Sequence, residues 1–131
     1  MIIDASALLA IILDEPDAAR YARAIASDRQ PRIPSVTWFE ASMRIEAAAD
    51  AVAISRFDDF PGDFGIEIIP FTARHAEAAR IGRRLYGRPQ HPAGLNFGDC
   101  LVYGVAKIER EPLLFKGDDF AQTDIEPALK D

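Results

Sequence analysis

The feature that most restricts the fold is an alternation of short apolar runs with segments of helical periodicity. Strand-like runs are expected at residues 1–4, 32–36, 66–71 and 112–115. Between them, apolar residues recur mostly at helical spacing, which indicates helices that bury one side. The expected helices span about 5–13, 17–27, 41–49, 52–57, 73–86 and 96–111, with a short one at 126–129. This order predicts an α/β fold around a central, mainly parallel sheet.

One domain is expected over residues 1–131, because a chain of this length supports one hydrophobic core and is too short for two ordinary domains. Its single cysteine, Cys100, cannot form an intrachain disulfide and lies in the apolar helix 96–111, where it fits a core position in a reducing compartment. The first residues include no basic segment, and the apolar run 8–13 is too short to span a bilayer. We therefore expect a cytoplasmic protein.

The formal net charge of −6 argues against a protein that binds nucleic acid through an overall positive field. A polyanionic partner would have to be attracted by a local basic patch or by a bound metal ion. The basic part of the chain is residues 74–91, and its candidate phosphate-binding residues are Arg80, Arg83, Arg84 and Arg88. The alternative is a solvated helix face paired with Glu77. Lys116 is a further candidate for a phosphate contact.

Carboxylates follow several of the expected strands. Asp4 ends the first strand, Glu40 follows the second, Asp99 lies in the first turn of the helix 96–111, and Asp118 follows the last strand. In a parallel sheet the carboxyl ends of the strands meet at one edge, so these side chains can share a cleft. Two charges about 4 Å apart repel by roughly 4 kcal/mol at an effective dielectric constant near 20, so such a cluster needs protonation or a cation. An all-oxygen ligand set suits Mg²⁺ or Mn²⁺ better than zinc.

Each acid also has a local structural explanation. Asn96 and Asp99 have the spacing of a helix N-cap and an acid at the third helical position, and Thr37 and Glu40 match a capping box ahead of the helix 41–49. Both interpretations stay open on the local sequence alone.

For several other residues, the sequence predicts whether the side chain is exposed or buried. His75 and His91 are expected on the surface, away from any metal, and the inward line of the helix 73–86 is expected at Ala78, Ile81 or Gly82, and Leu85. Trp38 and Phe39 either stack on a nucleic-acid base or pack in the core or a dimer interface.

Four segments together resemble a known family. They are Asp4-Ala5-Ser6 after the first strand, Glu40, Leu95-Asn96-Phe97-Gly98-Asp99, and Lys116-Gly117-Asp118-Asp119-Phe120 followed by Thr123-Asp124. In this order and at this chain length, they are similar to the PIN-domain ribonucleases, specifically the VapC-type toxins of toxin–antitoxin pairs. The resemblance implies a PIN-like three-layer sandwich whose sheet has four to five short strands flanked by helices.

The resemblance also implies a magnesium-dependent endoribonuclease toxin that works as a homodimer, cleaves RNA and is neutralised by a cognate antitoxin. Asp4, Glu40, Asp99 and Asp118 would be the catalytic and metal-binding acids, with Ser6, Asp119 and Asp124 as supporting residues. Asp118 is preferred as the fourth acid because it comes directly after the Gly117 turn. Asp119 could instead cap the tail, and Asp124 could hold a second or water-mediated ion.

Two alternatives use the same α/β pattern. A receiver-like phosphoacceptor domain would need paired acids after the first strand, an acceptor aspartate after a central strand and a lysine after the last, and only Lys116 fits. A PIN-like fold kept as a catalytically silent binding module would use the acids as helix caps. The RNA that is cut and the number of metal ions stay open.

Overall fold

The computed structural model describes residues 1–130, and within them four parallel strands form one sheet of order β3-β2-β1-β4. The strands are β1 (Ile2–Ile3), β2 (Arg32–Pro34), β3 (Glu67–Ile69) and β4 (Leu113–Leu114). Crossovers through helices connect them, as parallel pairing requires. The predicted α/β fold with a central parallel sheet is confirmed.

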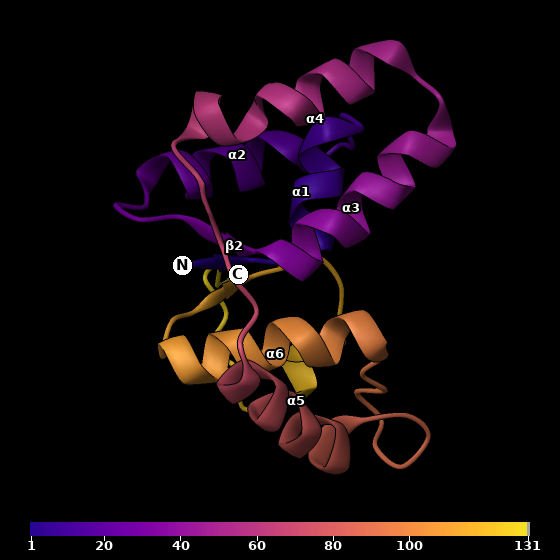
Figure 1. Cartoon of the computed structure of the whole chain (residues 1–131), viewed down its shortest axis with the longest axis vertical. Coiled ribbons are helices and arrows are strands. Elements are labelled where there is room, and N and C mark those ends of the chain that lie inside the picture. The colour runs from indigo at the N-terminus through magenta and orange to yellow at the C-terminus, as the bar shows by residue number, and fades with distance from the viewer. Residues whose placement is uncertain (131) are drawn as a thin grey trace.

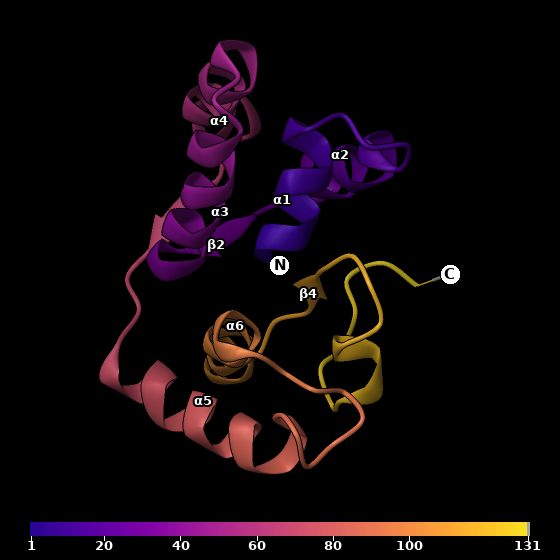
Figure 2. The same ribbon diagram turned by 90° about the vertical axis from the view of Figure 1, so that its right-hand side faces the viewer.

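Helices cover both faces of the sheet (Figure 1). On one side lie α1 (Ala5–Ile12), α2 (Ala18–Ser27), α3 (Ser35–Ala48) and α4 (Ala51–Phe64). On the other side lie α5 (Ala73–Tyr86) and α6 (Phe97–Glu109), followed after β4 by a 3-10 turn at Phe120–Gln122. Figure 2 shows the same three layers from the side. This is the predicted three-layer sandwich.

The core divides between the two faces because successive strand residues point to opposite sides. Ile3 and Leu114 pack with the helices α1–α4, whereas Ile2 and Leu113 pack with α5 and α6. Cys100 is buried in the second cluster, as predicted. None of the helices in residues 1–130 has the length and apolar character that crossing a membrane would require. The single-domain prediction for residues 1–131 stays a prediction, and Asp131 lies outside the described residues.

Three of the expected helices differ in the structure. α3 begins at Ser35, directly after β2, so Thr37 lies inside the helix and does not cap it. α4 extends past the expected end through Pro61 to Phe64, and Gly65 ends it with a left-handed φ of 63°. The short helix expected at 126–129 does not form. The capping-box prediction for Thr37 and Glu40 was wrong because Pro34 already serves as the N-cap.

The orientation of α5 also differs from the prediction. His75, Ala79 and Gly82 are its buried residues, whereas Ile81 and Leu85 are about half exposed. His75 was expected on the surface, but it is 3% exposed and its ring bonds Glu109 through Nε2 at 2.9 Å. Its Nδ1 accepts a hydrogen bond from the Thr72 backbone N–H, which completes the helix cap. Packing against α6 therefore determines which face of α5 is buried.

Candidate active site

Asp4 lies where β1 ends and α1 begins, and it is the N-cap of that helix. Its carboxylate accepts hydrogen bonds from the Ser6 backbone N–H at 3.1 Å and from the Ser6 hydroxyl at 2.5 Å. The Ser6 Oγ in turn accepts a bond from the Lys116 backbone N–H at 2.9 Å, which ties this turn to the loop after β4. Burial raises the pKa of Asp4 above its ordinary value, despite the bonds from Ser6. Ser6 therefore holds Asp4 in place, as the predicted supporting role requires.

Glu40 reaches the same region from the second turn of α3. Burial raises the pKa of its carboxyl first, and the negative charge of Asp4 raises it further, while Arg44 opposes both. Its carboxylate lies against the α-carbon of Gly98, and a β-carbon at position 98 would overlap that carboxylate. Glu40 is thus held beside the N-terminus of α6.

Asp99 is placed by a capping box at the start of α6. Asn96 Oδ1 accepts a bond from the Asp99 N–H at 2.9 Å, and Asp99 Oδ2 accepts one from the Asn96 N–H at 3.1 Å. Burial and the nearby carboxylates of Asp4 and Asp119 raise the pKa of Asp99 to about 7. The predicted N-cap at Asn96 is therefore confirmed, and the capped Asp99 lies near the acids Asp4 and Asp119.

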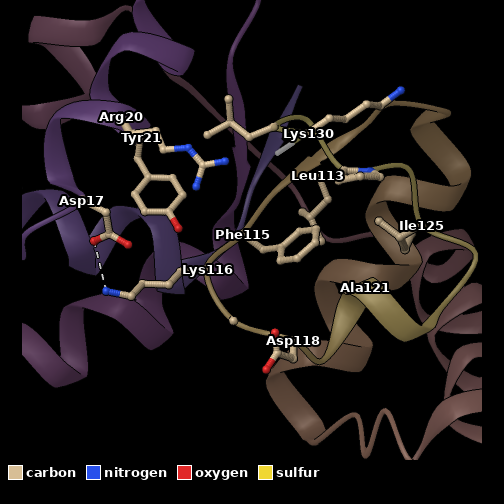
Figure 3. A pocket seen from close by; sticks show the side chains of 13 residues that line it. Asp17, Arg20, Tyr21, Leu113, Phe115, Lys116, Asp118, Ala121, Ile125 and Lys130 are labelled. Carbon is tan, nitrogen blue, oxygen red and sulfur yellow. Dashed lines mark hydrogen bonds and ion pairs between the residues drawn. The ribbon is translucent and has the colours of Figure 1, made fainter.

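The structure brings Asp119, and not Asp118, against Asp99. The negative charge of Asp119 raises the pKa values of both Asp99 and Asp4, so its side chain lies near these two carboxyl groups. Asp118 instead lines a cavity of about 640 Å³ between α2, the end of β4 and the C-terminal tail (Figure 3). The preference for Asp118 rested on the Gly117 turn, but a turn alone does not decide which of two adjacent side chains faces inward.

Two other predicted site residues bind elsewhere. Asp124 accepts bonds from the Tyr103 hydroxyl at 2.9 Å and from Lys107 Nζ at 2.8 Å, so it anchors the tail to α6. Lys116 Nζ pairs with Glu15 at 2.5 Å and with Asp17 at 3.0 Å; Figure 3 draws the contact with Asp17. Asp124 and Lys116 therefore bind groups other than Asp4, Glu40 and Asp99.

The remaining acids form one electrostatically linked group, which we call the acidic cluster: Asp4, Glu40, Asp99 and Asp119. As the side chains stand, residues 1–130 contain no set of three or more His, Cys, Asp or Glu side chains arranged to hold a metal ion. Burial and neighbouring negative charges raise the pKa values of Asp4, Glu40 and Asp99, which is an electrostatic stress among like charges. An all-oxygen set under this stress fits Mg²⁺ or Mn²⁺, which would draw the carboxylates together.

A basic groove lies beside Asn96, the N-cap of α6 that bonds Asp99. Arg80, Arg83 and Arg88 line a groove of about 410 Å³ between α5 and α6, and Arg84 is not part of its lining. The same groove includes Phe97, whose side chain is 81% exposed although it stands two residues before Asp99. No functional role was predicted for Phe97 from the sequence. Its place between the helix cap and the acid, at a position that faces away from the core, was the available signal.

The two aromatic residues that precede Glu40 lie in different environments. Trp38 stacks on Phe57 with ring centroids 3.9 Å apart, so it packs between α3 and α4. Phe39 is 63% exposed. The core-packing alternative is therefore correct for Trp38.

Comparison with known proteins shows the family and the fold to which the chain is similar. The family model of the PIN domain matches residues 1–126. Ribonuclease VapC30 of Mycobacterium tuberculosis is 42% identical over 125 residues, which cover 95% of each chain. Ribonuclease VapC28 of the same organism is 42% identical over 130 residues, 98% of each chain. A solved toxin–antitoxin complex from Klebsiella pneumoniae has a similar fold, with a TM-score of 0.71 and 19% identity over 94% of this chain and 92% of that one.

Proposed function

The chain belongs to the PIN-domain family and, within it, to the VapC ribonucleases, and on this basis we propose that it is a metal-dependent endoribonuclease toxin. The acidic cluster is its catalytic centre. The observation that carries this proposal is the shared electrostatic stress of Asp4, Glu40 and Asp99, whose pKa values are all raised by burial, with the Asp4 charge adding to the shift of the other two. A protein that needed these acids only as helix caps would gain nothing from crowding them.

Mg²⁺ or Mn²⁺ is the proposed cofactor. Asp4, Glu40, Asp99 and Asp119 would hold it, with Asp119 taking the place that the sequence analysis gave to Asp118. When bound, the ion supplies charge neutralisation at the phosphodiester and a water of lowered pKa.

The chain's own residues fix the acids. Ser6 holds the Asp4 carboxylate through two hydrogen bonds, Asn96 holds one oxygen of Asp99, and Gly98 gives the Glu40 carboxylate space at the start of α6. Positioning and charge compensation are the main sources of rate in phosphodiester cleavage, so rigid support of this kind is what the reaction needs.

The proposed partners are RNA, a cognate antitoxin and a second copy of the chain. The antitoxin is supported by the VapC relatives and by the fold of the Klebsiella pneumoniae complex. A homodimer is supported by the exposed apolar side chains of Phe39 and Met43 on α3, at 63% and 58% exposure. The cytoplasmic location stays a prediction, as do the RNA contacts expected at Arg84 and Lys116.

Cleavage of cellular RNA by the purified, antitoxin-free protein tests the proposal. We expect cleavage with Mg²⁺ or Mn²⁺, none in a chelator, and a loss of at least roughly 100-fold in Asp4→Asn with the fold retained, because asparagine also caps helices well. The matched control is Asp58→Asn, which changes an exposed acid of α4 outside the cluster. Equal activity in a chelator would refute metal dependence. RNA binding without cleavage under any metal would instead make the protein a silent PIN-like module.

A further inference from the structure

The groove between α5 and α6 combines an apolar floor with cationic rims. Ala79 and Leu101 belong to its lining together with Phe97, and Arg80, Arg83 and Arg88 stand around them. We call it the arginine groove. Its volume of about 410 Å³ lies within the range of small-molecule sites, which is roughly 300–1,000 Å³. It adjoins the acidic cluster, because Phe97 and Asn96 in its wall directly precede Gly98 and Asp99 in α6.

The positive charge of the groove is only partly compensated. Arg80 pairs with Glu77 at 3.3 Å, but both side chains are at least 65% exposed, so water screens the pair. Arg88 Nε donates to the neutral Gly94 carbonyl oxygen at 2.6 Å, which fixes the guanidinium without neutralising it. Arg83 follows Arg80 by three residues, so the two side chains lie on the same face of α5. The groove therefore suits an anion whose other parts are apolar.

Phe97 supplies the apolar surface that such a ligand would cover. It is the first residue of α6 and is 81% exposed, the largest exposed fraction among the large apolar side chains of residues 1–130. Single-stranded RNA has the matching chemistry, since its bases stack on aromatic rings and its phosphates pair with arginine.

We propose that the arginine groove holds a nucleotide next to the scissile phosphate, with its base on Phe97 and its phosphate against Arg83 and Arg88. This rests on the proposed ribonuclease function and adds a binding subsite to it. A second copy of the chain is the alternative occupant, and the sedimentation measurement described below distinguishes the two.

Binding of short, fluorescently labelled single-stranded RNA of random sequence tests this subsite. Measuring anisotropy in the Asp4→Asn background prevents cleavage and keeps the readout independent of catalysis. We expect Phe97→Ala to weaken binding by roughly 5- to 100-fold, the usual effect of removing a stacking aromatic, and Phe97→Trp to retain it. The matched control is Leu85→Ala, which removes an apolar side chain of α5 that is 52% exposed and lies outside the groove.

Salt dependence tests the phosphate contact. Arg83→Ala should lower the slope of log affinity against log salt by about 0.7, the value for one phosphate contact to a single strand. Arg74→Ala, on the same helix but outside the groove lining, should leave that slope unchanged. Equal slopes for the two variants would overturn the assignment of Arg83.

Two outcomes would overturn the subsite as a whole. One is unchanged RNA affinity in Phe97→Ala. The other is a change of oligomeric mass in Phe97→Ala, measured by sedimentation, without a change of RNA affinity, which would make the groove an interface between copies. Failure of the wild-type protein to cleave RNA would refute the proposed function instead, and the binding comparison would still decide the subsite.

Discussion

The carboxylate of Glu40 occupies the space that a side chain at Gly98 would fill, so a β-carbon at position 98 would displace that carboxylate. This contact joins residues far apart in the sequence and holds the Glu40 carboxylate against the first turn of α6, which carries Asp99.

Gly98→Ala should therefore impair catalysis while leaving the fold intact. The added methyl group displaces the Glu40 carboxylate, and a displacement of about 1 Å at a catalytic group can cost roughly 100-fold in rate. The measurement is kcat/KM for RNA cleavage together with the thermal midpoint. Gly62→Ala is the control, because a β-carbon at position 62 meets nothing within 4 Å. If the effect passes through Glu40, shortening that side chain in Gly98→Ala/Glu40→Asp should recover part of the activity; a double variant no better than Gly98→Ala argues against this route.

Asp119→Asn and Asp118→Asn should differ sharply. The charge of Asp119 raises the pKa of Asp99, so Asp119 belongs to the acidic cluster, whereas Asp118 lines the cavity beside α2. We expect Asp119→Asn to lose at least roughly 100-fold in activity, because even the partners of metal ligands are worth about 10- to 100-fold, and Asp118→Asn to stay within a few-fold of wild type. Equal losses in both variants would return Asp118 to the catalytic centre.

The raised pKa of Asp99 predicts how stability depends on pH in a chelator. The native state keeps a proton on Asp99 up to about pH 7, whereas the unfolded state releases it near 3.8. Between these values the native state binds more protons, so this residue makes stability fall as pH rises from about 4 to about 7. Mg²⁺ should counteract the fall near pH 7, because it binds the ionised acids of the native state. Thermal unfolding with and without Mg²⁺ measures both effects, and Asp99→Asn should flatten the dependence. A wild-type profile as flat as that of Asp99→Asn would contradict the assigned shift.

Thr37→Val should stabilise the protein. Thr37 is 2% exposed inside α3, and its hydroxyl has no hydrogen-bond partner, so it bears a desolvation cost that valine avoids at nearly the same shape. We expect a gain of about 1 kcal/mol in the free energy of unfolding, measured in denaturant. Thr123→Val is the matched comparison and should destabilise, since its hydroxyl donates to the Phe120 carbonyl oxygen and accepts from the Ile125 N–H. Loss of stability in Thr37→Val would indicate a partner for this hydroxyl.

Several features could be predicted from the sequence because they depend on residues close together in the chain. The alternation of strands and helices, the Asn96–Asp99 cap and the burial of Cys100 follow from local periodicity and capping chemistry. The family could be predicted as well, because its motifs are short and occur in a fixed order.

Other features could not be predicted, because they depend on which surfaces meet. The sequence pattern predicted an inward line of Ala78, Ile81 or Gly82, and Leu85 for α5. The structure buries Gly82 together with His75 and Ala79, and leaves Ile81 and Leu85 about half exposed. Gly82 is selected because the Tyr103 ring of α6 fills the space where a β-carbon would stand. Likewise, Thr37 and Glu40 have capping-box spacing, but Pro34 begins the helix earlier.

The sequence by itself thus determined the order of the elements, the parallel sheet and three acids placed near its carboxyl edge, since hydrogen-bonding and burial patterns repeat over a few residues. Only the tertiary structure decided that Asp119 and not Asp118 faces Asp99, that Glu40 lies on Gly98, and that Phe97 stands exposed beside arginines. These are contacts between segments distant in the chain, and their geometry is set by the packing of α3, α6 and the loop after β4 rather than by any local pattern.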